Sequence, residues 1–319
     1  MPEQVARLAE HVRHELSKSV VGQREALDQM LVSILCGGHA ILEGVPGVAK
    51  TLAVKTLART CRVAFQRVQC TPDLMPADVT GTNVFNAATG EFVLRQGPVF
   101  TEMLLVDEIN RTPPRTQAAL LEAMEERQVT IDGSRHVLSP FFTVFATQNP
   151  IEFEGTYPLP EAQLDRFLMK IRVGYPESAE EVEVLERYHQ GFDARDLDGL
   201  EITPVEASLL ESARHEVGRV RVEPAIFRYV TDLIRRTRDW PSLTLGASPR
   251  AAIALLLVAK AQAALEGRDY LIPDDVKGAA LPVLRHRLLL NFQAQSERVT
   301  TDQVIDQLLA AVPTPRSGM

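Results

Sequence analysis

The sequence predicts an α/β fold with a mostly parallel sheet, followed by a second, all-helical domain. Three observations support this prediction. Short apolar runs alternate with helical patterns up to about residue 175, a loop rich in Gly and Pro joins the first of these runs to a helix, and the later patterns are helical. The turn Gly-Tyr-Pro at residues 174–176 marks the expected boundary, so we expect domains at residues 1–175 and 176–319.

Composition and charge are typical of a globular, cytoplasmic chain. Hydrophobic residues make up 45% of the 319 residues, enough for a packed core. The formal net charge of −8 argues against a surface built for nucleic acid. Cys36, Cys61 and Cys70 lack metal-like spacing, which favours a reducing compartment. The longest apolar run, residues 251–259, is about half a membrane span, so we expect no membrane-spanning helix.

Two helices are expected before the first strand, over residues 3–20 and 24–35. Val5, Leu8, Val12 and Leu16 form one apolar stripe, which predicts that the first helix packs against a core. Between the helices, residues 20–23 read Val-Val-Gly-Gln. The pattern alone gives this stretch only a packing role.

The strongest chemical signal is the loop Gly-Val-Pro-Gly-Val-Ala-Lys-Thr at residues 44–51. It follows an apolar run and leads into a helix, and this strand–loop–helix order is the context of a phosphate-binding loop. Loop amides and the helix N-terminus would hold phosphates, Lys50 would meet the β- and γ-phosphates, and Thr51 would bind Mg²⁺. The alternative is a Gly/Pro turn before an ordinary helix, with Lys50 in solvent.

Ala49 departs from the general loop pattern, which has Gly before the lysine. A Cβ at this position is tolerable only if the backbone avoids glycine-only conformations. The residues expected to contact the nucleotide here are Gly44, Val45, Pro46, Gly47, Val48, Ala49, Lys50, Thr51 and Leu52.

The second strand is predicted at residues 64–70, where the pattern alternates. Residues 71–98 are rich in turn formers and contain a predicted β-hairpin, with strands at 81–86 and 91–95 around the turn 87–90. A long insertion of this kind is usually functional or an interaction element.

Paired carboxylates end the next apolar run, residues 101–106, at Asp107 and Glu108. A buried parallel strand has this pattern, and ligands bind at the carboxyl ends of such strands. Asp107 would hold Mg²⁺, directly or through water, and Glu108 would polarise the attacking water as general base. The alternative, a strand ending in solvated acids, is weakened by the phosphate loop one strand upstream.

A helix at residues 115–127, a hairpin at 129–138 over Asp132-Gly133, and a buried strand at 141–147 follow. Asn149 comes directly after this strand, where its amide would point at the γ-phosphate or the attacking water. The alternative is an ordinary Asn-Pro turn.

Two arginines further along are candidates for phosphate contacts. Arg166 lies in a short helix at residues 159–167, before the fifth strand at 167–173. It would either pair with Asp165 or Glu161, or serve a neighbouring subunit's nucleotide as an arginine finger. Arg250 lies in the first turn of an apolar helix, where a cation opposes the helix dipole and an anion would relieve the conflict. Earlier in this half, a capping box predicts a helix beginning after Thr203.

These motifs together resemble the AAA+ ATPases, in particular the MoxR family. The resemblance rests on the phosphate loop, Val-Asp-Glu-Ile-Asn-Arg at 106–111, Ala-Thr-Gln-Asn-Pro at 146–150, Leu-Asp-Arg-Phe at 164–167 and Ser-Pro-Arg at 248–250. Residues 154–167, which begin at Glu154, are similar to a long MoxR signature. The resemblance extends over about residues 20–290, and Ala49 is familiar within this family.

The resemblance implies a five-stranded α/β/α core with a helical lid, binding ATP and Mg²⁺. Lys50 and Thr51 match the Walker A motif, and Asp107 and Glu108 match Walker B. Asn149 matches sensor 1.

Arg166 matches the arginine finger of the family and Arg250 matches sensor 2. The resemblance also places Gln23 in an adenine pocket formed by residues 20–23. The hairpins in residues 71–98 and 129–138 look like the helix-2 and pre-sensor-1 inserts. Family members form rings, usually hexamers, and act as chaperone-like machines on protein clients. They work with von Willebrand factor A domain proteins, often in metal or cofactor insertion.

Other functions stay open at this point. A nucleic-acid motor shares the same inserts, although the net charge and the hairpin turns, which carry no basic cluster, argue against it. A magnesium-chelatase-like ATPase subunit is a further alternative. A nucleotide-locked scaffold would not require Glu108, and a small-molecule kinase would leave Asn149 and Arg166 without roles.

Overall fold

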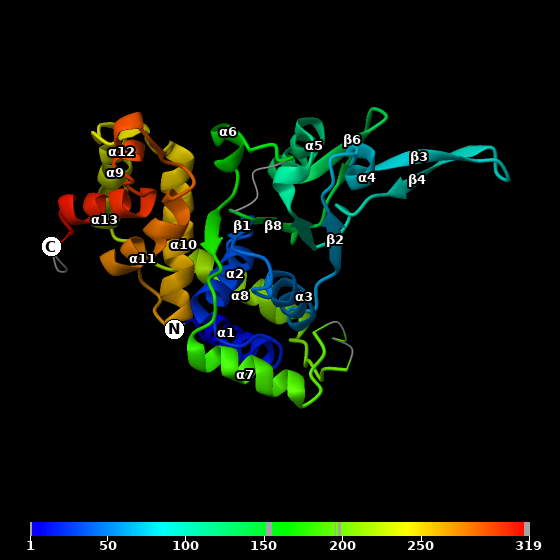
Figure 1. The fold of residues 1–319 in the computed structure, drawn as a ribbon, viewed down its shortest axis with the longest axis horizontal. Coiled ribbons are helices and arrows are strands. Elements are labelled where there is room, and N and C mark those ends of the chain that lie inside the picture. The colour runs from blue at the N-terminus through cyan, green and yellow to red at the C-terminus, as the bar shows by residue number, and fades with distance from the viewer. Residues whose placement is uncertain (1, 151–154, 195, 197–198, 316–319) are drawn as a thin grey trace.

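The computed structural model describes residues 2–150, 155–194, 196 and 199–315; Glu154 of the signature stretch lies outside them (Figure 1). Within the described residues one parallel sheet has five strands, in the order β2-β5-β8-β1-β9. This confirms the expected five-stranded parallel sheet. The strands are β1 (Ala40–Glu43), β2 (Phe65–Gln69), β5 (Met103–Asp107), β8 (Thr143–Gln148) and β9 (Met169–Arg172).

The central strands are buried on both faces, which explains their continuous apolar runs. In β1, Ala40 and Leu42 join one buried cluster, and Ile41 between them joins a second cluster on the opposite face. Leu42 lies opposite Thr147 of β8 and Ile171 of β9. Because the strands are parallel, their carboxyl ends meet at one edge of the sheet, where the polar residues follow.

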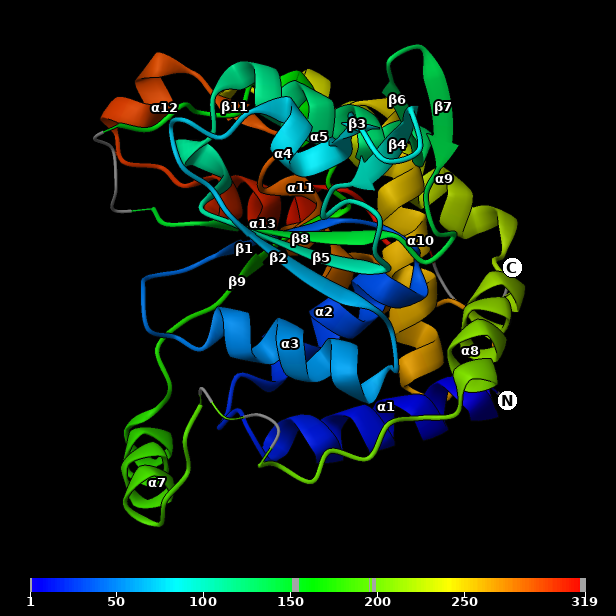
Figure 2. The ribbon, with the colours of Figure 1, turned by 90° about the vertical axis from the view of Figure 1, so that its right-hand side faces the viewer.

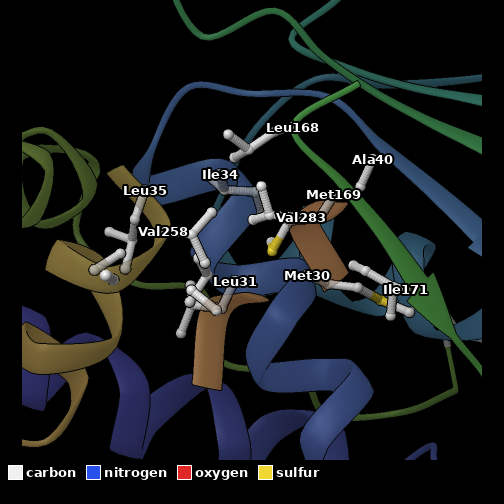
Figure 3. Close-up of a cluster of buried hydrophobic side chains, with 14 of the residues drawn as sticks. Met30, Leu31, Ile34, Leu35, Ala40, Leu168, Met169, Ile171, Val258 and Val283 are labelled. Carbon is white, nitrogen blue, oxygen red and sulfur yellow. The ribbon is translucent and has the colours of Figure 1, made fainter. Parts of the chain in front are cut away.

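Helices cover both faces of this sheet (Figure 2). One face packs against α1 (Glu3–Ser17), α2 (Arg24–Leu35) and α3 (Lys50–Thr60). The other packs against α4 (Pro76–Thr80) and α5 (Pro114–Glu126). Figure 3 shows that α2 and β9 also meet side chains of two C-terminal helices, Val258 and Val283, so the core continues into the second half of the chain.

Both predicted hairpins are present. The first pairs β3 (Gly81–Asn86) with β4 (Glu91–Gln96) and extends away from the body as an arm (Figure 1). The second pairs β6 (Gln128–Ile131) with β7 (Ser134–Val137) across Asp132 and Gly133, whose φ angles of 48° and 81° fit a tight hairpin turn. Asn83 Nδ2 donates to Asp132 Oδ2 at 2.9 Å, so the two hairpins touch.

The second half is helical, as expected, with one addition. A short antiparallel ribbon joins β10 (Leu243–Leu245) to β11 (Leu289–Leu290). The helices are α7 (Ser178–His189), α8 (Ala207–Arg219), α9 (Pro224–Arg238), α10 (Pro249–Leu265), α11 (Pro273–Leu284), α12 (Phe292–Ser296) and α13 (Thr301–Ala311). Between the sheet strands lie η1 (Ile109–Arg111) and the single turn α6 (Glu161–Leu164). No helix of the described residues is long and apolar enough to cross a membrane.

The predicted helix start after Thr203 is wrong, because α8 begins at Ala207. Residues 203–206 are instead extended and bound to the α/β part of the chain. The Thr203 amide donates to Glu15 Oε2 at 2.8 Å, and the Val205 amide donates to the Thr60 carbonyl at 2.8 Å. Long-range hydrogen bonds therefore override the local capping signal. The division of the chain at residue 175 stays a prediction.

Candidate nucleotide-binding site

A cavity of about 1170 Å³ lies at the carboxyl ends of the sheet strands; we call it the loop cavity. The phosphate loop and α3 form one wall, and the ends of β5 and β8 form another. Residues from α7, including Val184 and Leu185, line the cavity from the side of the second half. Its size and its place at the strand ends are those expected of a nucleotide site in an open α/β sheet.

The loop backbone explains two of its glycines. A Cβ on Gly44 would lie 2.3 Å from the Val173 carbonyl oxygen, so only glycine allows this close approach. Gly47 has a φ of +87°, in the region that favours glycine. Ala49 caps α3 with φ 57° and ψ 22°, a left-handed conformation that an alanine adopts at a cost of about 1 kcal/mol. The general pattern has glycine here for that reason, and this chain carries the strain.

Lys50 is held inside the curve of the loop. Its Nζ donates to the carbonyls of Gly44 at 2.5 Å and Val45 at 2.9 Å. Burial lowers the pKa of the Lys50 ammonium below its ordinary value, and the charges of Asp107 and Glu108 oppose this shift. A cation that is already partly desolvated at the loop is suited to meet phosphate oxygens.

Asp107 accepts hydrogen bonds from two strands and a helix. Thr51 Oγ1 donates to its Oδ2 at 3.3 Å, and Thr147 Oγ1 donates to its Oδ1 at 2.7 Å. Arg67 of β2 donates to Oδ2 through Nε at 3.0 Å and through a terminal nitrogen at 2.7 Å. Arg67 and Thr147 were not predicted from the sequence. Arg67 lies in the alternating pattern of β2 and Thr147 in the buried run of β8, and their contact with Asp107 follows only once the strand order is known.

Glu108 adopts a left-handed backbone, with φ 59° and ψ 51°. Its amide donates to Thr147 Oγ1 at 2.8 Å, so one threonine fixes both acidic residues. Its carboxylate accepts from Gln69 Nε2 at 3.2 Å and forms an ion pair with Arg111 at 3.2 Å. A non-glycine residue in this conformation is strained, and such strain clusters at functional sites.

The residues present fit a nucleotide and its metal. Gln23 and Val21 line the loop cavity, and Gln23 Nε2 donates to the Val48 carbonyl at 3.2 Å. The buried Gln23 Oε1 has no hydrogen-bond partner among the described residues and remains available as an acceptor. Thr51 and Asp107 offer the hard oxygen atoms that Mg²⁺ prefers. The described residues contain no cluster of three or more His, Cys, Asp or Glu residues that could hold a metal.

The structure brings some of the predicted site residues together and separates others. Asn149 lines the loop cavity with Lys50, Asp107 and Glu108, whereas Arg166 and Arg250 are not among its described lining residues. These two arginines line a separate cavity of about 280 Å³.

We call this second place the arginine face: Arg166, Arg250 and the residue between them, Glu125 of α5. Arg166 Nε lies 3.2 Å from Glu125 Oε2, and Arg250 donates to both Glu125 oxygens, at 2.6 and 3.2 Å. The two arginines therefore share one carboxylate, an ion pair that the sequence analysis did not include among the partners of Arg166.

Comparisons with known proteins agree with this geometry. A family described as "ATPase family associated with various cellular activities (AAA)" matches residues 39–169, and an "AAA lid domain" matches residues 235–308. The uncharacterized protein YeaC of Bacillus subtilis is 45% identical over 97% of this chain and 95% of its own length. Chaperone MoxR1 of Mycobacterium tuberculosis is 43% identical over 95% of this chain and 81% of its own length. A crystal structure of a candidate ATPase from Cytophaga hutchinsonii has a TM-score of 0.89 at 41% identity, covering 98% of both chains.

Proposed function

The chain belongs to the MoxR family of AAA+ ATPases, and we propose that it forms a ring. In this ring each ATP binds in the loop cavity of one subunit, and the arginine face of the next subunit completes the site. It hydrolyses ATP to ADP and phosphate, as its family does. We propose a hexamer, the usual ring of the family.

The loop cavity supplies the part of the site that belongs to the same subunit. Lys50, which lies inside the loop, would meet the phosphates, and the adjacent Thr51 and Asp107 would hold Mg²⁺. When bound, Mg²⁺ neutralises charge on the β- and γ-phosphate oxygens. Glu108 accepts a proton from the attacking water, and Asn149 orients that water or the γ-phosphate.

The observation that carries the proposal is the separation of the two sites. Arg166 and Arg250 lie together outside the described lining of their own loop cavity, with Glu125 between them. Two guanidinium groups on one carboxylate leave a net positive charge, which suits a phosphate group. Such a pair serves catalysis if it meets the loop cavity of a neighbouring subunit.

We propose that the ring uses hydrolysis to remodel a protein client, together with a von Willebrand factor A domain partner, in metal or cofactor insertion. The relative named Chaperone MoxR1 supports a chaperone-like role. The β3–β4 arm supports a protein contact, because Phe85, Phe92 and Val93 are exposed on it. The arm carries one basic residue, Arg95, whereas a nucleic-acid contact would need a positively charged groove beside the aromatic side chains.

Substitution of Arg166 tests the proposal. Arg166→Ala should lower turnover about 10³-fold with little change in ATP affinity, because a trans arginine acts on the developing charge. Mixing it with Lys50→Ala subunits should restore activity, because about a quarter of the junctions then join an intact loop to an intact arginine face. Phosphate release measures turnover of the variant and of the mixture, ATP titration measures affinity, and sedimentation shows whether the subunits assemble.

The matched control is Arg221→Ala, which removes an exposed arginine paired with Asp269 and should leave turnover unchanged. Mixed rings that stay as inactive as Arg166→Ala alone would contradict the arrangement between subunits. Turnover that DNA stimulates would instead favour the nucleic-acid alternative.

A further inference from the structure

Arg287, three residues after the end of α11, is a buried arginine that the proposed reaction does not use. Its side chain is only 3% exposed. The guanidinium has five N–H donors, and five hydrogen bonds use them. Nε donates to Asp165 Oδ1 at 2.7 Å, and the terminal nitrogens donate to the carbonyls of Asp165, Phe167, Leu168 and Val283. Because its donors are already engaged, Arg287 is not a phosphate ligand.

Asp165, the partner of Arg287, also holds the start of α10. Its second oxygen, Oδ2, accepts a hydrogen bond from Ser248 Oγ at 2.8 Å. Ser248 is the N-cap of α10, and its Oγ also accepts from the Ala251 amide at 3.3 Å. One carboxylate therefore joins the end of α11, the start of α10 and the segment before β9.

The neighbours of these residues in sequence are the two arginines of the arginine face. Arg166 directly follows Asp165, and Arg250 lies two positions after Ser248. The Asp165 contacts thus fix the two backbone positions from which these arginines project. Glu125 then joins the two guanidinium groups at their far ends.

We infer that Asp165, Arg287 and Ser248 form a positioning cluster that holds Arg166 and Arg250 in register as one unit for the neighbouring subunit's nucleotide. This inference rests on the proposed function. It makes Arg287 a positioning residue for hydrolysis in the adjacent subunit, acting through Asp165.

The plain alternative is that the cluster only stabilises the packing of the second half on the sheet. The chain offers a matched pair for comparison. Arg268 donates to both oxygens of Asp275, at 2.8 and 2.5 Å, and its side chain is 21% exposed. Its hydrogen bonds lie within residues 268–275, so it has the same chemistry without joining Asp165 or the start of α10.

The experiment compares Arg287→Lys with Arg268→Lys in the full chain. Arg287→Lys keeps the charge but has too few donors for the five acceptors, so Arg166 and Arg250 lose their register. We expect turnover to fall about 30-fold and the KM for ATP to change less than about threefold, because a misplaced group affects the transition state more than binding. Arg268→Lys should lower the melting temperature but keep turnover within about twofold.

Mixed rings separate positioning from a defect in the chain's own site. Arg287→Lys retains an intact loop cavity, so mixing it with Lys50→Ala subunits should restore turnover, as it does for Arg166→Ala. If the Arg166→Ala mixture recovers and the Arg287→Lys mixture does not, the inference is overturned while the proposed function stands. If neither recovers, the proposed function itself fails.

A second variant covers the case in which Arg287→Lys does not assemble. Asp165→Asn keeps the shape of the side chain and an oxygen for Ser248, and it removes the charge that Arg287 requires. It should reproduce both the loss of turnover and the recovery in mixed rings. Wild-type turnover in an assembled ring of either variant would also overturn the inference.

Discussion

The loop cavity and the arginine face both contain charged side chains, yet those side chains are held in different ways. In the loop cavity, Asp107 accepts from Thr51, Thr147 and Arg67, so several groups of the same site fix one carboxylate. On the arginine face, two arginines share Glu125, and the segments that carry them are joined by the half-buried Asp165. Under the proposed function, the first site would receive a ligand and the second would present charge to one.

The largest expected effect comes from Glu108→Gln, which removes the proposed base but keeps the side chain's shape. Turnover should fall about 10³-fold while ATP stays bound, because proton transfer is lost and phosphate contacts remain. Mixing with Lys50→Ala subunits should give no recovery, because both changes lie in the same loop cavity. Phosphate release and retained nucleotide measure this. Glu122→Gln, at an exposed position on α5, is the control. Recovery of turnover in the mixture of Glu108→Gln and Lys50→Ala subunits would contradict the assignment of both residues to one loop cavity.

The pH dependence of stability tests the contribution of one buried histidine, His39, to the sheet. His39 precedes β1; its Nδ1 accepts from the Val144 amide at 2.9 Å, and its Nε2 donates to the Met124 carbonyl at 3.1 Å. Burial lowers the pKa of His39 to about 4. Between that value and the unfolded pKa of about 6.5, only the unfolded chain binds the proton. Stability should therefore fall by about 3 kcal/mol as the pH drops through this window, and be fully present above it.

Urea unfolding at pH 5 and pH 7 measures about 2 kcal/mol of this loss, because these two pH values span about 1.5 units of the window. His39→Gln should reduce the difference between the two values, whereas His189→Gln, at an exposed position, should leave it unchanged. A part of the slope will persist in His39→Gln, because burial also lowers the pKa of His286 well below its ordinary value. If the free energy of unfolding depends on pH equally in wild type and His39→Gln, then His39 does not cause the loss of stability.

The smallest effect is expected from Thr147→Val, which keeps the buried shape and removes the hydroxyl that joins Asp107 to the Glu108 amide. The Mg²⁺ concentration for half-maximal turnover should rise about tenfold, because Asp107 loses a donor that orients it. Stability should fall by about 1–2 kcal/mol. Thr143→Val is the matched control, a buried threonine in the same strand whose hydroxyl donates to the Phe141 carbonyl at 3.2 Å. An equal Mg²⁺ shift in both variants would make the effect one of strand packing.

The same comparison shows what sequence can predict. Lys50, Thr51, Asp107 and Glu108 follow from local order, because a strand, a loop and a helix in succession determine where their side chains lie. The parallel strands follow from apolar runs of the right length, and β2 follows from an alternating pattern. Both hairpins follow from Asp132-Gly133 and the Gly90 turn.

The remaining features depend on long-range contacts. Arg67 meets Asp107 only because β2 lies beside β5, and Arg250 meets Glu125 across 125 positions in the chain. The Asp165 to Arg287 contact spans 122 positions. The helix predicted after Thr203 fails for the same reason, since Glu15 and Thr60 bind the segment in an extended form. Local patterns carry no information about such partners.

The exposure of helix α7 offers a way to measure nucleotide occupancy. None of its residues, all of them described, is buried, and Leu185 is 69% exposed although it lines the loop cavity. One of its attachments is the hydrogen bond from Arg187 to the Ser17 carbonyl at 2.7 Å. A bound adenine would therefore act as the missing core of this helix, burying Val184 and Leu185. Amide hydrogen exchange along α7 would then slow when nucleotide binds and quicken when it is released. The exchange rate of this helix would therefore report whether its subunit holds a nucleotide.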